Sequence, residues 1–159
     1  MAEKNTTKTV KKKAAKKAVK KAAKPKVLTV AGKRKTAIAK ATIRAGTGKV
    51  KINKRNLEAF NQLKRLYLIE PLVIAQDVLK DDAGKFDIMV NVKGGGMESQ
   101  IEASRLAIGR ALVLFTGNDA LKSAYLKYDR SMLVADVRRK EMRKPGDSKA
   151  RRKRQTSYR

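Results

Sequence analysis

Residues 86–117 bring together groups that can bind an anion. Residues 86–93 alternate apolar and polar side chains, as a half-buried strand does. Apolar residues at helical spacing then run as far as Gly117, which is typical of a helix end. Free backbone N–H groups and the dipole at a helix start attract anions. The candidate anion site lies between strand and helix: Lys93, Gly94, Gly95 and Gly96. The alternative is that the three glycines only make a tight connection.

Further basic residues extend this site and suggest a second one. Arg105 and Arg110 follow along the expected helix. Nearer the amino terminus, Gly32 precedes Lys33, Arg34 and Lys35. This segment superficially resembles the end of a phosphate-binding P-loop, but the first glycine is missing and an arginine replaces the Ser or Thr that contacts magnesium. We therefore interpret it as a basic bend between two strands.

Several kinds of catalysis lack the residues they require. The sequence has no Cys and no His, which excludes zinc fingers, thiol nucleophiles, disulfides and histidine acid–base chemistry. The 14 acidic residues are scattered and form no obvious carboxylate pair or metal cluster. An enzyme remains an alternative in principle, but we expect no enzymatic activity, no metal and no cofactor.

The charge of the chain predicts a polyanionic partner. Lys and Arg number 41 against 14 Asp and Glu, a net charge of +27, so the chain repels itself unless an anion neutralises it. A membrane surface is the rival to nucleic acid. The sequence shows no apolar run of about 18 residues and no amphipathic helix that pairs a basic face with large apolar residues. We expect nucleic acid, no membrane contact and a cytoplasmic location.

The pattern divides the chain into three parts. Residues 1–26 are Lys/Ala-rich and of low complexity, so we expect a disordered tail that makes salt-sensitive phosphate contacts or none. Residues 27–126 are expected to form the globular domain. Residues 127–159 are Arg-rich and largely lack apolar periodicity, which favours an extended arm on folded RNA over an unstructured tail. Candidate RNA contacts in the arm are Arg138, Arg139, Arg151 and Arg152.

Periodicity predicts the elements of the globular domain. Strands are expected at 27–31 and 36–44, and residues 45–48 are expected to close a hairpin onto a strand at 49–53. A helix capped by Asn56 should turn Leu57, Phe60, Leu63 and Leu66 inward, with a kink or a break at Pro71. A last helix, capped by Asn118, should pack Leu121, Ala124 and Tyr125 against the core.

Short motifs in a fixed order identify a family resemblance. They are Gly32-Lys-Arg-Lys-Thr-Ala-Ile-Ala39, Ile52-Asn53, Glu70-Pro-Leu72, the stretch from Phe86 to Gly96, Gln100, Ala107-Ile-Gly-Arg-Ala-Leu112, Tyr128-Asp-Arg130 and Ser157-Tyr-Arg159. Over about residues 29–159 the chain resembles the universal ribosomal protein number nine family of the small subunit. The Ser-Tyr-Arg ending and the pattern Asp-x-Arg-x-x-Glu from Asp136 to Glu141 resemble its archaeal and eukaryotic branch.

The resemblance implies a fold and a function. The fold would be α+β, a two-layer α/β sandwich with the order strand, strand, strand, helix, strand, helix and a left-handed crossover, although general rules favour a right-handed one. The protein would be a structural constituent of the small ribosomal subunit that binds ribosomal RNA in the head, beside neighbouring proteins. Its carboxyl-terminal arm would extend toward the peptidyl-site tRNA, with Tyr158 and Arg159 in contact with it.

One further alternative is a linker-histone-like or nucleoid protein that compacts DNA. The Lys/Ala tail is typical of such proteins. Their core would contain a helix-turn-helix or a winged helix, and the alternating strands at 36–53 and 86–93 do not predict one.

Overall fold

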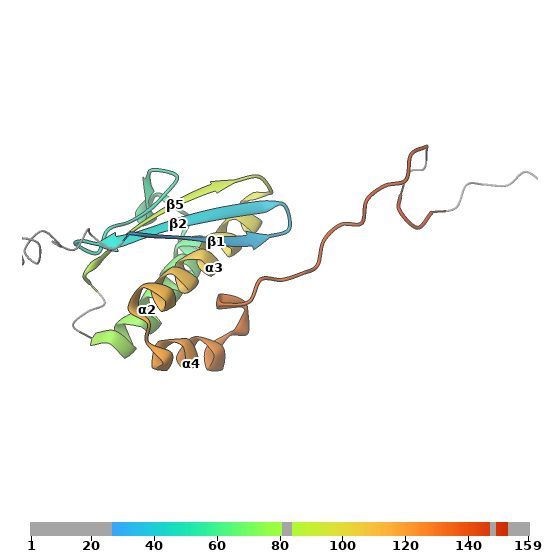
Figure 1. Ribbon diagram of the computed structural model, residues 1–159. Helices are drawn as coiled ribbons and strands as arrows, with labels where there is room; N and C mark the ends of the chain where they lie inside the picture. Colours follow the sequence, from blue (N-terminus) through green and yellow to red (C-terminus); the bar gives the residue numbers. More distant parts are fainter. Residues whose placement is uncertain (1–26, 81–83, 147–148, 153–159) are drawn as a thin grey trace, which may run out of the picture.

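The computed structural model describes residues 27–80, 84–146 and 149–152. The Lys/Ala segment 1–26 and the two predicted tRNA contacts, Tyr158 and Arg159, lie outside these ranges. A twisted sheet forms one layer, helices cover one of its faces, and the carboxyl-terminal arm leaves the globule (Figure 1). The fold is therefore α+β in two layers, as expected.

The sheet is mixed and five-stranded. Its strands lie in the order β1-β2-β5-β3-β4. All neighbouring pairs are antiparallel except β3 and β5, which are parallel and are joined through the helical layer. The left-handed sense of this crossover stays a prediction of the family resemblance. The strands are β1 (Leu28–Arg34), β2 (Ala37–Ala45), β3 (Val50–Ile52), β4 (Arg55–Asn56) and β5 (Phe86–Lys93).

The expected hairpin between β2 and β3 is wrong. Strand β5 lies between them and pairs with both, in register Thr42 to Met89 to Lys51. The loop after β2 instead wraps around the start of β5, where Gly46 N donates to Lys85 O at 2.8 Å. The Asp87 carboxylate accepts from Thr47 N and Lys49 N at 2.9 and 3.2 Å. Because this strand is distant in sequence, a local turn pattern does not reveal it.

Three α-helices and two short 3-10 helices make up the described helical structure. Helix α3 ends at Gly117, whose φ of 65° is left-handed. Asn118 caps α4 as expected, since its side chain accepts from Ala120 N at 2.9 Å. Helix α4 continues to residue 128, two residues past the expected end of the globular domain at residue 126. The helices are η1 (Leu57–Ala59), α2 (Gln62–Leu79), α3 (Met97–Thr116), α4 (Asp119–Tyr128) and η3 (Arg130–Met132).

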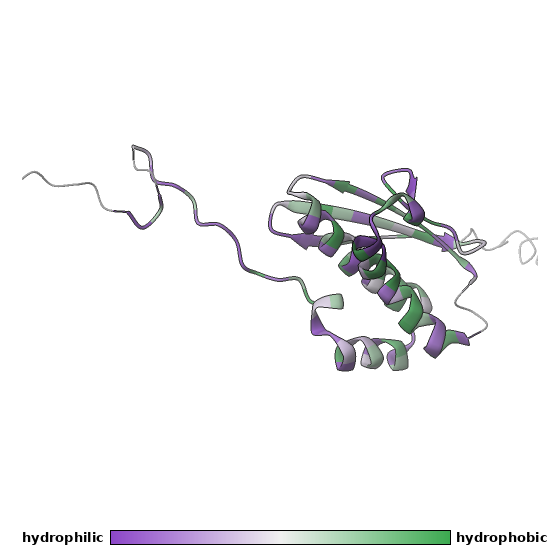
Figure 2. Ribbon diagram, turned by 180° about the vertical axis from the view of Figure 1, so that it is seen from behind, coloured by the Kyte–Doolittle hydropathy of each residue, from purple (hydrophilic) through white to green (hydrophobic). Residues whose placement is uncertain are grey.

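Helix α2 differs from the expectation in its start and in its buried face. Asn56 precedes only the short η1 and makes no side-chain cap hydrogen bond. The long helix begins at Gln62 and continues through Pro71, which is itself buried. Leu63 and Leu66, expected to face inward, are 70% and 58% exposed. The reason is that α2 is apolar along most of its length, with polar residues interspersed (Figure 2), and only weakly amphipathic, so the sequence pattern does not select the buried side.

The core lies between β2 and α3. Alternate residues of β2, Ala37 to Ile43, are fully buried against small residues of α3. These small side chains bring the two backbones close together. At Gly32 on β1, a Cβ atom would lie 2.3 Å from Ala103 O, so only glycine fits there.

Candidate nucleic-acid interface

The face of the sheet away from the helices is basic. Alternation along the strands puts exposed side chains on it from β1, β2, β3 and β5. We call this surface the open sheet face and define it by Lys33, Lys40, Arg44, Lys51 and Lys93, together with Thr29, Ile38, Thr42, Met89 and Asn91.

Strand register brings its lysines together. Lys33, Ile38 and Lys93 form one row across β1, β2 and β5, so the two lysine backbones lie two strand spacings apart, roughly 10 Å. Lys40 lies on β2, two residues after Ile38 and on the same face. Among the described residues, none forms an ion pair with Lys33, Lys40 or Lys93. Phosphates of a polyanion can therefore approach them without displacing a carboxylate.

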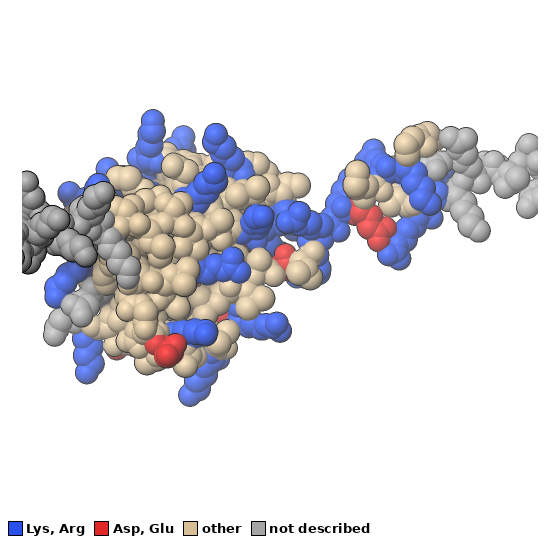
Figure 3. Space-filling model, in the orientation of Figure 1, with Lys and Arg blue, Asp and Glu red and all other residues tan. Residues whose placement is uncertain are grey.

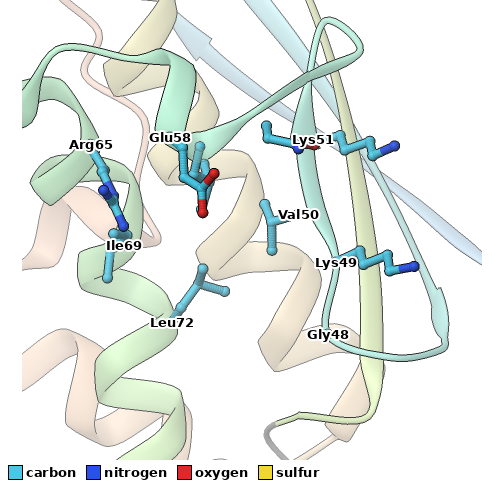
Figure 4. A pocket seen from close by; sticks show the side chains of 10 residues that line it. Gly48, Lys49, Val50, Lys51, Glu58, Arg65, Ile69 and Leu72 are labelled. Atoms are coloured by element: carbon cyan, nitrogen blue, oxygen red, sulfur yellow. The ribbon is translucent and has the colours of Figure 1, made fainter.

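Two lysines, one directly before β3 and one on it, lie at the far side of this face. Lys49 and Lys51 extend away from a hollow of about 470 Å³ that lies between β3 and α2 (Figure 4). Val50 points into the hollow, and Glu58 and Arg65 line it from the other side. The hollow has both charge signs in its wall, whereas the side chains of Lys49 and Lys51 point away from it.

The Asp87 carboxylate lies close to the open sheet face and already has hydrogen-bond and ion-pair partners. Asp87 accepts from Thr47 N and Lys49 N, and its Oδ2 lies 3.4 Å from an Arg44 guanidinium nitrogen. These backbone hydrogen bonds, and to a lesser degree Arg44, hold the pKa of Asp87 below its ordinary value. The carboxylate thus organises the loop at 46–49 and offsets one cation.

The two predicted basic turns lie against each other at one end of the sheet. The turn between β1 and β2 lies at Lys35 and Thr36, with Lys35 at a φ of 51°. The glycine turn after β5 packs against it, because a Cβ on Gly94 would lie 2.7 Å from Thr36 O. Gly94 and Gly95 also have left-handed φ values of 75° and 70°. Lys33 and Lys35 therefore lie at the same end of the sheet as Lys93, although about 60 residues separate them in sequence.

The glycine turn leads directly into α3. Gly96 is the N-cap residue, and no side chain caps the first turn. Gln100 donates from Nε2 to Gly94 O at 3.1 Å, which fixes the turn against the helix. Because Gly96 has no side chain, it cannot cap the first N–H groups of α3, and Lys93 lies three residues before it, which is compatible with the anion-site interpretation. Both the connecting role and an anion-binding role are compatible with this geometry.

The three arginines expected to contribute here have partners within the chain. The Arg34 guanidinium contacts Glu102 on α3 and Asp136 at the start of the arm. Its hydrogen bond to Glu102, above all, raises the pKa of Arg34. Arg110 donates from Nε to Leu133 O at 2.7 Å and from an Nη atom to Ala31 O at 3.1 Å. These side chains join the first strand, the central helix and the arm.

The Arg105 side chain is more enclosed than that of Arg34, with 11% against 18% exposed. Its Nε lies 2.7 Å from Glu70 Oε2 and its Nη1 lies 2.9 Å from Asp129 Oδ2. The Nε contact pairs the charges without an aligned hydrogen bond. The Tyr67 ring lies 5.9 Å from the guanidinium carbon. Arg105 therefore serves the packing of α2 and α4 on α3, and RNA contact by Arg34 or Arg105 stays a prediction.

The start of the carboxyl-terminal arm is fixed to the domain. Met132 is fully buried, and Gly109 on α3 makes room for its backbone, since a Cβ there would lie 3.0 Å from Met132 O. Asp136 accepts from Arg138 N at 2.8 Å and from the Arg138 guanidinium at 2.7 and 2.9 Å. This side-chain pairing is the main reason that the pKa of Asp136 is far below its ordinary value.

Beyond this anchored start the arm is extended and basic. Residues 133–146 contain no helix or strand and lead away from the globule, with Lys and Arg along them (Figure 3). Arg138 and Arg139 are exposed, and their contact with RNA stays a prediction. Arg151 reaches back to Glu141, with Nε 3.0 Å from Oε2, and Arg152 follows it. The sequence interpretation omitted Lys140, Arg143 and Lys144, although they are exposed on the same segment.

Other omissions concern the open sheet face. Lys40, Arg44 and Lys51 were not singled out as binding residues, although strand alternation already places them opposite the apolar positions. The described residues contain no group of three or more acidic residues that could hold a metal ion. No helix in the described ranges is long and apolar enough to cross a membrane.

Comparison with known proteins agrees with the family resemblance. Residues 32–159 match the family model described as ribosomal protein S9/S16. The chain is 47% identical over 137 residues to the small ribosomal subunit protein uS9 of Methanococcus maripaludis strain C5, an alignment that covers 84% of this chain and 99% of the relative. It is 46% identical, with the same coverage, to the protein of that name from Methanococcus vannielii. The fold, the basic surface and these matches agree, and the chain belongs to the ribosomal protein S9/S16 family.

Proposed function

We infer that this protein is a structural component of the small ribosomal subunit in the cytoplasm, where it binds ribosomal RNA in the subunit head. The observation that carries this assignment is the group of lysines on the open sheet face, continuous with the two basic turns, with which no described residue forms an ion pair. Membership in a family of ribosomal proteins, rather than of enzymes or DNA compactors, supports RNA as the polyanion.

The basic residues divide into phosphate contacts and contacts within the domain. Contacts to phosphate come from the open sheet face and from the two turns: Lys33, Lys35, Lys40, Lys93, Gly94, Gly95 and Gly96. Arg34 and Arg105 hold the arm and helices in place, because their guanidinium groups already contact carboxylates. In the arm, Arg138 and Arg151 also contact carboxylates, but their side chains stay 82% and 87% exposed, so phosphates can still reach them. The guanidinium groups of Arg138, Arg139, Arg151 and Arg152 suit bidentate contacts to phosphates and stacking on bases.

The carboxyl-terminal arm extends toward the peptidyl-site tRNA. The anchored start and extended course of residues 133–146 support an arm that reaches well beyond the domain, since each extended residue adds about 3.3 Å. Along this path Tyr158 and Arg159 contact the backbone of the peptidyl-site tRNA. Removing residues 157–159 should leave subunit assembly intact and weaken tRNA binding by about 1–3 kcal/mol, the scale of a charge-assisted hydrogen bond. Unchanged tRNA affinity would contradict this role.

A binding experiment tests the RNA interface. The triple variant Lys33→Ala, Lys40→Ala, Lys93→Ala should bind small-subunit RNA more weakly, and the slope of log affinity against log salt should fall by about 2, or about 0.7 for each phosphate that the variant no longer neutralises. The matched control is Lys80→Ala, Lys122→Ala, Lys127→Ala, which removes the same charge elsewhere on the domain. Equal effects of the two variants would show that only total charge matters and would contradict a defined interface.

A further inference from the structure

Helix α2 carries an exposed apolar stripe on its outer side. Leu63, Leu66, Tyr67 and Val73 are 70%, 58%, 55% and 45% exposed, and Tyr128 of α4 lies beside them with 60% exposed. Together they border a shallow hollow of about 570 Å³. We call this surface the α2 groove and define it by its lining: Leu63, Leu66, Tyr67, Ile69, Glu70, Val73, Ile74, Asp77 and Tyr128.

The stripe has the length and spacing of a docking site for a protein segment. Its residues recur every three or four positions from Leu63 to Asp77, so they follow one side of the helix for about four turns, or roughly 21 Å. The opposite side of α2 already packs on the core through Leu68, Pro71 and Ala75. A helix that is apolar on both sides is normally covered on both.

The charges in the groove argue against RNA as its occupant. Both charged residues in the lining are carboxylates, Glu70 and Asp77, and the lining contains no Lys or Arg. On a chain with a net charge of +27 this is a marked departure from the rest of the surface. Carboxylates repel phosphates, and the lining offers a nucleic-acid backbone no cation. Its hydroxyl donors are those of Tyr67 and Tyr128, and Tyr128 already donates to Glu70.

The two carboxylates differ in what they offer a partner. The Glu70 carboxylate already has partners in this chain, because Tyr128 donates to its Oε1 at 2.6 Å and Arg105 Nε lies 2.7 Å from its Oε2. The hydrogen bond to Glu70 also raises the pKa of Tyr128. Asp77 is exposed, and no cation among the described residues contacts it. A cation from outside can therefore pair with Asp77.

A second copy of this chain fits the groove poorly. In a two-fold contact the same surface meets itself. Each Asp77 would then lie against a stripe that contains no Lys or Arg and would gain no cationic partner from the second copy. The complementary occupant has apolar side chains at helical or strand spacing and at least one Lys or Arg at the end that meets Asp77.

We propose that the α2 groove binds an apolar segment with basic flanks from another protein of the small subunit. The inference rests on the proposed function, since it places the chain inside that particle. The groove lies on the helical layer, and the open sheet face lies on the opposite side of the sheet. The fold therefore joins RNA on one side to a protein on the other.

Photo-crosslinking in purified small subunits identifies the occupant. The photoreactive residue p-benzoylphenylalanine is introduced in place of Leu66, and in a second variant in place of Met89 on the open sheet face. The Leu66 variant should form a crosslink to one polypeptide, at a peptide with apolar residues and a neighbouring Lys or Arg. The Met89 variant should crosslink to ribosomal RNA. Crosslinks from the Leu66 position to RNA, to residues 1–26 of the same chain, to a second copy, or to nothing would overturn the proposal.

A charge substitution provides an independent readout. Leu66→Asp should reduce retention of the crosslinked protein in salt-washed subunits by about tenfold, the scale of losing one anchor side chain. Leu114→Asp is the matched control, since Leu114 is also 58% exposed and also lies on a helix. Unchanged protein content with Leu66→Asp would contradict the groove as an interface. Absence of the unsubstituted chain from small subunits would instead contradict the proposed function.

Discussion

The Arg34 guanidinium on β1 contacts the carboxylate of Asp136, 102 residues later in the chain. The same carboxylate accepts from the backbone and side chain of Arg138. Together with the bond from Arg110 to Leu133 O, these contacts fix where the arm leaves the domain. The direction of an otherwise extended arm is therefore set by side chains of β1 and α3.

Removing the Asp136 carboxylate should loosen the start of the arm. With Asp136→Asn, Arg34 keeps Glu102 as a partner but no longer holds the arm through an ion pair. Because local opening exposes the backbone to protease, trypsin should cleave after Arg138 and Arg139 faster, on the order of several-fold. Glu141→Gln is the control, since its ion pair with Arg151 lies farther along the arm. Equal cleavage rates in the two variants would show that Asp136 does not anchor the arm.

Met132 should matter for the stability of the whole domain. Its side chain is fully buried in the core, although it belongs to the segment that leads into the arm. Met132→Ala should lower the free energy of unfolding by about 2–5 kcal/mol, because it leaves a cavity. Met142→Ala, at a residue 91% exposed, should change it by less than about 0.5 kcal/mol. Urea denaturation of the two variants measures both changes in unfolding free energy. If Met132→Ala changed it as little as Met142→Ala, Met132 would not belong to the core.

The close contact of β1 with α3 should make Gly32 irreplaceable. A methyl group at Gly32 would meet backbone atoms of α3, Ala103 O and Ala107 N, which have little freedom to move. Gly32→Ala should therefore cost about 1–3 kcal/mol of unfolding free energy. At Gly84 a Cβ meets nothing within 4 Å, so Gly84→Ala is the matched control. Thermal unfolding that is unchanged in Gly32→Ala would contradict this packing.

Low pH should lower the free energy of unfolding, because it protonates carboxylates that are paired in the folded domain. Burial alone would raise the pKa of Asp129, but hydrogen bonds from Ser131 and Arg105 outweigh it and lower the pKa. A lowered pKa in the folded state stabilises the fold above the unfolded value of about 3.9, and this contribution is lost as the pH falls through the folded value.

The urea midpoint should therefore stay level between about pH 5 and pH 8 and fall below about pH 4. Asp129→Asn should be less stable than the unsubstituted chain at neutral pH and should show a smaller fall in acid. Glu141→Gln should follow the unsubstituted chain. A midpoint that rises on acidification, or an unchanged profile for Asp129→Asn, would contradict this role of Asp129.

Local patterns predicted the centre of the fold well. In β5 the apolar positions Ile88, Val90 and Val92 are buried as the alternation indicated. The change from a period of two to a helical period across the glycines marked the start of α3, and Asn118 marked the start of α4. Each of these signals lies within a few residues of the structure that it predicts.

Other features depend on contacts between distant residues. The insertion of β5 beside β3 is such a contact, and so is the choice of which side of α2 is buried. The sequence also does not distinguish an arginine that binds phosphate from one that binds carboxylate. Arg34 and Arg105 were predicted from residue type alone, and their partners Glu102, Asp136 and Asp129 become visible only in the folded chain.

Lysine acylation in purified small subunits tests the central claim most directly. Lys33, Lys40 and Lys93 should be protected from the reagent in the intact particle and should become reactive after digestion of the RNA with ribonuclease. Lys122 and Lys127 on α4, which are exposed and lie on the opposite layer, should react in both states. If the three lysines of the open sheet face reacted equally before and after digestion, while the chain was present in the subunit, the open sheet face would not be its RNA-binding surface.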